Sequence, residues 1–218
     1  MQKKIKMGIV GAGTWGETHA YIYKEHVNAE PVAICDMNRA RAQAIADKFG
    51  IQEVYSDYRE MAEKADIDAV AIVTPDFAHA DIACCFAEHK KHLLIEKPLA
   101  TTREDAERIV AAVKSNGVRC MVDLHNRWNA PFNTCKQLID AGKLGTPYTA
   151  YIRHSDCKWV ATDMLSWAAK SSILWFLGSH SLDTLRWLFN DEVKRVYSVK
   201  REGILRAEGV DTPDIYLT

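Results

Sequence analysis

A glycine-rich loop near the amino end constrains the fold of this chain more than any other feature. The apolar run of residues 5–10 leads directly into Gly11-Ala12-Gly13-Thr14-Trp15-Gly16, and a helical pattern over residues 14–26 follows. A G-x-G-x-x-G match alone is weak. It becomes specific between a strand and a helix, with an acidic residue ending the next strand. Asp36 is that residue, because it ends the apolar run of residues 31–35. This context predicts a dinucleotide-binding βαβ unit.

Each part of the loop has a predicted role in binding a dinucleotide. Gly11 allows the tight turn, Gly13 lets the backbone approach a pyrophosphate, and Gly16 lets the helix pack close to the strand. The first N–H groups of the helix and its positive dipole end would bind the phosphates. We therefore expect the backbone of Ala12, Thr14 and Trp15 to contact the cofactor.

Asp36 bears on which dinucleotide is bound. Its carboxylate would accept hydrogen bonds from the ribose hydroxyls and repel a 2′-phosphate, which favours NAD. Arg39 and Arg41 lie close by in sequence, so NADP stays open.

Two other enzyme classes with glycine loops fit less well. Methyltransferases commonly need a third glycine where Trp15 stands. Short-chain dehydrogenases need a Tyr-x-x-x-Lys pair, and the segment Tyr21-Ile22-Tyr23-Lys24 has the wrong spacing.

The first 123 residues alternate strand and helix patterns with short connections. Such repeated βαβ units predict a doubly wound parallel sheet, the Rossmann type of α/β fold, over residues 1–123. The expected strands are residues 5–10, 31–35, 69–73, 92–95 and 119–122, and the expected helices are residues 14–26, 39–49, 76–88 and 101–115.

The pattern changes after residue 123, which predicts a second, α+β domain over residues 124–218. A helix is expected over residues 130–141, and residues 148–154 alternate like an antiparallel strand. Residues 172–190 are apolar almost all round, so this helix should be buried. Residues 193–200 and 214–217 predict further strands.

Composition excludes several classes of protein. The 28 basic and 29 acidic residues give a net charge of −1, so nothing predicts a nucleic acid or an anionic membrane as partner. No apolar run approaches the roughly 18 residues of a membrane helix, and no signal-peptide region is recognisable. The six cysteines form no C-x-x-C pair and have no metal-ligand spacing. We therefore expect reduced thiols in the cytoplasm and no metal site.

A second motif, Glu96-Lys97-Pro98, ends the apolar run of residues 92–95. Ligands of such sheets bind beyond the carboxyl ends of the strands, so Lys97 would face the cofactor. A lysine held there can stabilise a developing alkoxide, although a strand-end surface lysine is the better interpretation of this motif alone.

Together these motifs resemble the Gfo/Idh/MocA family of NAD(P)-dependent oxidoreductases, which act mainly on sugars, inositols and related polyols. The resemblance covers nearly the whole chain. Its motifs are the glycine loop with Asp36, Thr74-Pro75-Asp76 with His79, Glu96-Lys97-Pro98, Asn126-Arg127-Trp128-Asn129 and Gly178-Ser179-His180-Ser181-Leu182-Asp183.

The resemblance implies roles for several residues. Lys97 binds the reacting hydroxyl, Glu96 lies near the nicotinamide ribose, and Thr74 and His79 line the cofactor cleft. For His79, packing or capping at the start of a helix is an equal alternative. It also implies a second domain with an open, mostly antiparallel sheet that is usually longer than the residues available here. We therefore expect an incomplete second domain and association into a homo-oligomer through that sheet.

His180 is the second catalytic candidate, because an imidazole can take the hydroxyl proton as the hydride leaves. The alternative is a buried histidine bonded to a neighbour. Much of the family has an aspartate four residues earlier, where this chain has Phe176. Either Asp156 or Asp163 substitutes for it, or Lys97 and His180 act alone.

On the substrate side, His125 follows the sixth strand, and Trp159 could stack on a sugar face; an ordinary surface is the alternative for each. The function predicted is hydride transfer between a polyol hydroxyl and NAD. An NAD-dependent glycoside hydrolase of the same family and a non-catalytic NAD-binding sensor are the alternatives.

Overall fold

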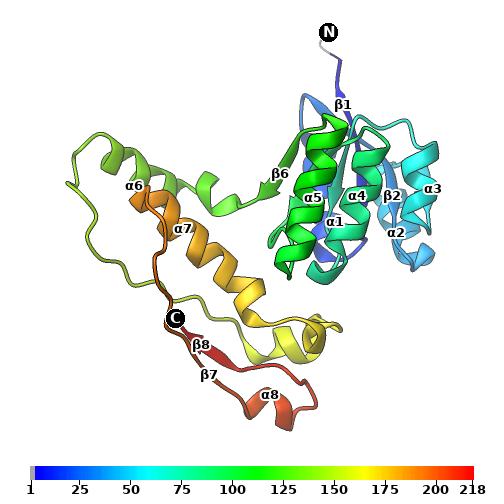
Figure 1. Ribbon diagram of the computed structural model, residues 1–218. Helices are drawn as coiled ribbons and strands as arrows, with labels where there is room; N and C mark the ends of the chain where they lie inside the picture. Colours follow the sequence, from blue (N-terminus) through cyan, green and yellow to red (C-terminus); the bar gives the residue numbers. More distant parts are fainter. Residues whose placement is uncertain (1–2) are drawn as a thin grey trace. The chain divides into compact units, whose positions relative to one another are not determined.

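The computed structural model describes residues 3–218, in which the chain forms two units that join between Asp123 and Leu124 (Figure 1). The first unit contains a parallel sheet in the order β3-β2-β1-β4-β5-β6. This is the order of a doubly wound dinucleotide-binding sheet, so the predicted α/β fold class is confirmed. The strands are β1 Ile5–Val10, β2 Ala29–Cys35, β3 Glu53–Tyr55, β4 Ala69–Ile72, β5 His92–Glu96 and β6 Cys120–Asp123.

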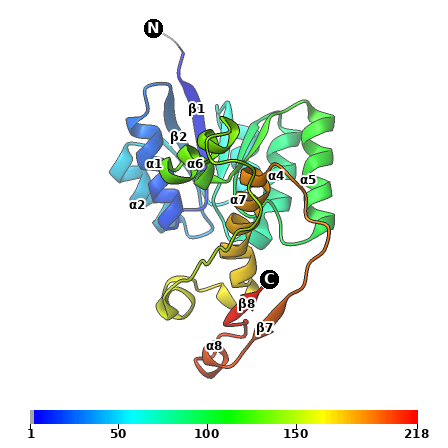
Figure 2. The same cartoon turned by 90° about the vertical axis from the view of Figure 1, so that its left-hand side faces the viewer.

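Helices cover both faces of this sheet. Figure 2 shows α1 and α2 on one side and α4 and α5 on the other. Successive residues of β1 point to opposite faces of the sheet, so Ile9 lies in one apolar core and Val10 in the other. The strands are therefore apolar on both sides, which is why they read as continuous apolar runs. The helices are α1 Thr14–Glu25, α2 Arg39–Phe49, α3 Tyr58–Lys64, α4 His79–Glu88 and α5 Arg103–Asn116, with a 3₁₀ turn, η1 Asp76–Ala78, before α4.

Capping residues place the ends of these helices. The Asn38 side chain accepts a hydrogen bond from the backbone of Arg41 at the start of α2, and Gly50 ends this helix in a left-handed conformation. Sequence analysis did not identify β3 or α3. Both are short and bounded by polar residues, and their apolar positions give too few repeats to establish a period.

The second unit is built mainly from helices. It contains the 3₁₀ turn η2 His125–Trp128, α6 Ala130–Asp140, α7 Ser179–Phe189 and α8 Ile204–Ala207. A two-stranded antiparallel sheet joins β7 Val199–Arg201 to β8 Ile215–Leu217. It also contains the π-helical turns η3 Val160–Met164 and η5 Leu174–Gly178 and the 3₁₀ turn η4 Ala168–Lys170.

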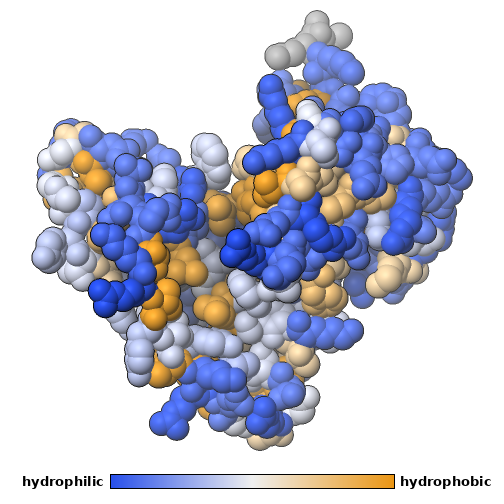
Figure 3. Space-filling model, viewed as in Figure 1, coloured by the Kyte–Doolittle hydropathy of each residue, from blue (hydrophilic) through white to orange (hydrophobic). Residues whose placement is uncertain are grey.

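One predicted strand of this unit is absent, another is shorter than predicted, and one helix is less buried than predicted. Residues 148–154 form no strand, because their alternating side chains have no sheet to cover, and Tyr148 is 97% exposed. The helix predicted over residues 172–190 is present, as the π-helical turn η5 followed by α7, but the expectation that it is buried was wrong. Instead, α7 buries mainly a polar stripe because it packs along one face. Only the last part of the run 193–200 enters β7. Leu144, Val196 and Ile204 are among the exposed apolar side chains of this unit. Figure 3 shows apolar patches at the surface.

No helix within residues 3–218 is both long enough and apolar enough to cross a membrane.

Candidate functional site

The connection from β1 into α1 requires glycine at two positions, Gly11 in the loop and Gly16 in the first turn of α1. Gly11 has a φ of +110°, and a Cβ atom there would lie 2.7 Å from the carbonyl oxygen of Val73. A Cβ atom on Gly16 would lie 2.0 Å from the carbonyl oxygen of Gly11. Real Cβ atoms do not approach backbone this closely, so these glycines let α1 begin directly against β1 and β4.

Gly13 differs, because its Cβ position is open. No atom of the described residues comes within 4 Å of a Cβ atom built there. Gly13 is the N-cap residue of α1 and has no side chain to bond the first N–H groups of the helix. The N-terminus of a helix beside open space suits a phosphate group, because its first N–H groups point outward and its dipole is positive there.

Asp36 holds this loop against the end of β2. Its Oδ2 accepts a hydrogen bond from the backbone N–H of Ala12 at 2.8 Å, and its Oδ1 accepts one from Asn38 at the same distance. The residue predicted to bind the ribose therefore also positions the loop predicted to bind the phosphates. Its ribose contact stays a prediction.

Thr74 and His79 lie where β4 gives way to η1 and α4. His79 is fully buried, with Nδ1 2.9 Å from the carbonyl oxygen of Pro98 and Nε2 3.1 Å from that of Thr74. The ring thus joins the end of β4 to the segment after Lys97. Cofactor contact by His79 stays a prediction. Thr74 Oγ1 is buried and has no hydrogen-bond partner among residues 3–218, which suits a polar ligand.

Burial lowers the pKa of His79, although the carbonyl groups of Thr74 and Pro98 act in the opposite direction. The folded protein therefore keeps the ring neutral at pH values where the unfolded chain binds a proton. The free energy of unfolding should fall as the pH drops below about 6.5, by up to about 1.4 kcal/mol per pH unit. Denaturant titrations between about pH 7 and about pH 5 should show this slope reduced in His79→Gln. An unchanged slope in His79→Gln would contradict the assignment of this pH dependence to His79.

Glu96 ends β5 and Lys97 follows it, and both residues are buried. Glu96 Oε2 accepts a hydrogen bond from the backbone N–H of Lys97 at 3.2 Å. Glu96 Oε1 lies 3.4 Å from His19 Nε2, and Asp123 Oδ2 lies 3.9 Å from the same nitrogen.

His19 and Asp123 were not predicted from the sequence, although a signal for Asp123 was available. Asp123 directly follows the strand pattern of residues 119–122, and the carboxyl ends of neighbouring parallel strands meet at one edge of the sheet. The register pairs Asp123 with Glu96. His19 lies early in α1, three residues after the last glycine of the loop.

In the second unit, an ion pair brings two predicted substrate-side histidines together. Arg127 of η2 donates to both carboxylate oxygens of Asp183 in α7, at 2.9 and 2.5 Å. This pair joins η2 to α7, and the ring centroids of His125 and His180 lie 4.6 Å apart. His154 lies beside them, 6.3 Å from the His180 ring.

Phe176 and Trp159 lie in different surroundings. The Phe176 ring meets the edge of Trp167 at 6.3 Å, and both line a largely apolar cavity of about 250 Å³ within the second unit. Asp156 also lines this cavity. Trp159 is exposed and directly precedes η3. Substrate contact by Trp159 stays a prediction.

The sequence matches two family profiles in the order of the two units. Residues 5–124 match the Gfo/Idh/MocA oxidoreductase family, described as having an NAD-binding Rossmann fold. Residues 132–216 match the Gfo/Idh/MocA C-terminal domain.

Individual relatives agree with these matches. The inositol 2-dehydrogenase of Salmonella paratyphi B is 32% identical over 195 residues, which are 88% of this chain and 56% of that protein. The inositol 2-dehydrogenase 3 of Saccharopolyspora erythraea is 32% identical over 98% of this chain and 62% of its own length. The crystal structure of scyllo-inositol dehydrogenase from Lactobacillus casei with bound NAD(H) and scyllo-inositol has a TM-score of 0.83 at 25% identity, covering 95% of this chain and 63% of that one. The chain thus spans less than two thirds of the length of these relatives.

Proposed function

The chain belongs to the Gfo/Idh/MocA family of oxidoreductases, and we propose that it transfers a hydride between a polyol hydroxyl and NAD, with inositols as the first candidate substrates. The observation that carries this proposal is the open space at Gly13, where the N-terminus of α1 lies beside a loop fixed by Asp36. The inositol dehydrogenase names of the relatives support the class of substrate.

The residues at the strand ends fit a dinucleotide. Backbone N–H groups of residues 13–16 would hold the pyrophosphate, because those of Gly11 and Ala12 already bond the Cys35 carbonyl and Asp36. Asp36 would contact the ribose, and Thr74 Oγ1 a polar group of the cofactor. Bound NAD supplies the hydride acceptor.

In this proposal Lys97 and His180 act on the substrate. Lys97 donates a hydrogen bond to the reacting hydroxyl oxygen and stabilises its developing negative charge. His180, as a neutral imidazole, accepts the hydroxyl proton, and the hydride leaves from the same carbon. His125 and Trp159 would contact other parts of the polyol.

We also propose that the protein works in the cytoplasm as a homo-oligomer. The cysteines among the described residues are all free thiols, as expected in a reducing compartment. Exposed strands such as β7 offer unpaired edges to a second copy.

Absorbance of the reduced nicotinamide tests the proposed activity. Myo-inositol, scyllo-inositol, free sugars and glycosides are each supplied with NAD. We expect NADH to accumulate with at least one inositol. Glycoside cleavage without net NADH would indicate a hydrolase, and NAD binding without turnover of any substrate would indicate a sensor.

Replacing Asp36 should change the preference between the two dinucleotides. Asp36→Ala removes the charge-assisted hydrogen bonds proposed to the ribose, so the NAD dissociation constant should rise at least about 10-fold. Affinity for NADP should fall less, because its phosphate no longer meets a carboxylate. Calorimetric titration of both dinucleotides measures this, with Asp47→Ala on the exposed face of α2 as the control. Equal losses of affinity for NAD and NADP would mean that Asp36 only holds the loop in place and does not contact the ribose.

A further inference from the structure

A cluster of titratable side chains lies next to Lys97 in the first unit, and the proposed mechanism does not use it. His19 is its centre. Its Nε2 lies 3.4 Å from Glu96 Oε1 and 3.9 Å from Asp123 Oδ2, and its Nδ1 lies 2.9 Å from the hydroxyl of Tyr23. The His19 and Glu96 side chains are 7% and 8% exposed, and that of Asp123 is 19% exposed.

The chemistry of this cluster determines where protons lie. Carboxylates accept hydrogen bonds but do not donate them, so the nitrogen that faces Glu96 and Asp123 carries a proton. That N–H separates two negative charges that would otherwise repel each other in a buried setting. Burial raises the pKa of Tyr23, and the charges of Asp123 and Glu96 raise it further. Tyr23 therefore keeps its proton and holds the other ring nitrogen of His19.

The cluster reaches Lys97 through Glu96. One oxygen of the Glu96 carboxylate faces His19, and the other accepts the backbone N–H of Lys97 at 3.2 Å. Rotation of this carboxylate would break both contacts at once. The group that fixes its rotation therefore also fixes the backbone from which the Lys97 side chain extends.

We propose that His19 is a positioning residue: its Nε2–H fixes the Glu96 carboxylate, which in turn holds the Lys97 backbone in the orientation that catalysis needs. The proposal rests on the proposed function, in which Lys97 contacts the reacting hydroxyl. It assigns His19 no contact with the substrate.

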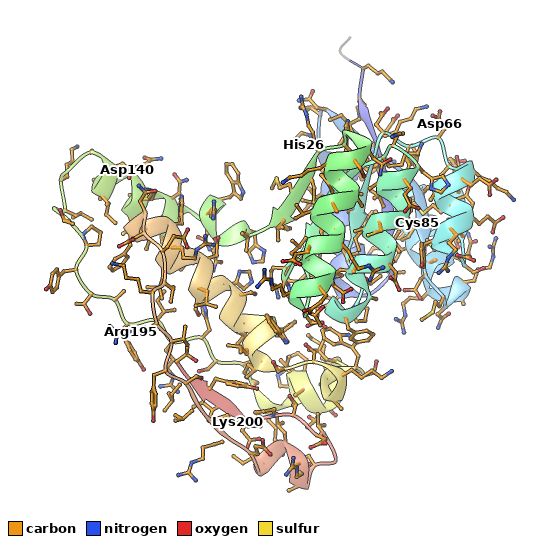
Figure 4. The ribbon with its side chains drawn as sticks, viewed as in Figure 1. His26, Asp66, Cys85, Asp140, Arg195 and Lys200 are labelled. Atoms are coloured by element: carbon orange, nitrogen blue, oxygen red, sulfur yellow. The ribbon has the colours of Figure 1, made fainter. Side chains whose placement is uncertain are left out.

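Two substitutions at His19 separate positioning from general stability. His19→Gln places an amide N–H near the position of Nε2, whereas His19→Leu fills the space without a donor. In His19→Leu we expect kcat to fall about 10- to 100-fold, the range typical of lost orienting contacts, with the dissociation constant of NAD unchanged. His19→Gln should recover most of the loss. His26→Leu is the control, because His26 is exposed at the carboxyl end of the same helix (Figure 4).

Hydrogen exchange at the Lys97 amide gives a readout that does not need turnover. Exchange should be faster in His19→Leu than in the wild type and His19→Gln. If the wild type oxidises no polyol, the proposed function fails, and this exchange comparison still decides the role of His19. If His19→Leu does not fold, Tyr23→Phe replaces it, and faster exchange at Lys97 is again expected.

Three results would overturn the proposal. The first is a His19→Leu protein with wild-type kcat and wild-type exchange at Lys97. The second is an equal loss of kcat in His19→Leu and His19→Gln. The third concerns a metal, because the ligand atoms of His19, Glu96 and Asp123 all lie within 4.8 Å of one another. A stoichiometric divalent cation found by elemental analysis and lost in His19→Gln would make His19 a metal ligand.

Discussion

Replacing Lys97 by alanine should lower the rate of polyol oxidation by about 10²- to 10³-fold, the loss typical when a donor to a developing oxyanion is removed. Lys97 is buried at the carboxyl end of β5, where doubly wound sheets bind their ligands. Its ammonium group has no other role in the proposed mechanism. The affinity for NAD should therefore change little.

Steady-state kinetics and calorimetric titration of NAD on the same preparations check this result. Lys91→Ala is the matched control, because Lys91 directly precedes β5 at the opposite edge of the sheet and bonds the Ile67 carbonyl. Equal rates in Lys97→Ala and the wild type would remove Lys97 from the mechanism. A loss explained by weaker NAD binding would make it a cofactor-binding residue.

Alanine substitutions at two glycines of the motif should affect the stability of the protein differently. Gly16→Ala places a Cβ atom 2.0 Å from the backbone carbonyl of Gly11, so α1 must move away from β1. We expect a loss of about 1–3 kcal/mol of unfolding free energy, or more, because backbone cannot yield as a flexible side chain does. Gly13→Ala adds its methyl group to open space at an ordinary φ of −83°, so stability should be unchanged.

The affinity for NAD separates these two variants further. The methyl group of Gly13→Ala occupies the space through which the backbone is proposed to approach the pyrophosphate, so NAD binding should weaken at least about 10-fold without any loss of stability. Denaturant titration and calorimetry measure both quantities. Weaker NAD binding in Gly16→Ala alone, with Gly13→Ala unaffected, would place the phosphates elsewhere.

The first unit could be predicted closely because its signals are local. The hexapeptide of residues 11–16, the cap at Asn38 and the left-handed Gly50 each fix a boundary through contacts within a few residues. β3 was missed because three residues cannot show a period, and its pairing with β2 is a long-range contact. The strand predicted for the second unit over residues 148–154 was wrong, because the side-chain alternation suggested a strand but the structure has no partner strand there.

The candidate site likewise combines local signals, which the sequence shows, with long-range contacts, which it does not. Asp36 could be proposed from the sequence because it directly follows a strand pattern, and Thr74 and Lys97 because their motifs resemble those of the Gfo/Idh/MocA family. The contact of His19 with Glu96 joins residues 77 positions apart, and no local pattern indicates it. The pairing of Arg127 with Asp183 likewise depends on how η2 packs against α7, which only the folded structure gives.

Calorimetric titration of NAD into the wild-type chain tests whether the glycine loop before α1 binds a dinucleotide. We expect heat that fits one site per chain, a weaker response with NADP, and a response reduced by Gly13→Ala in a protein of unchanged stability. A folded wild-type chain that gives no heat with NAD, NADH or NADP would contradict it.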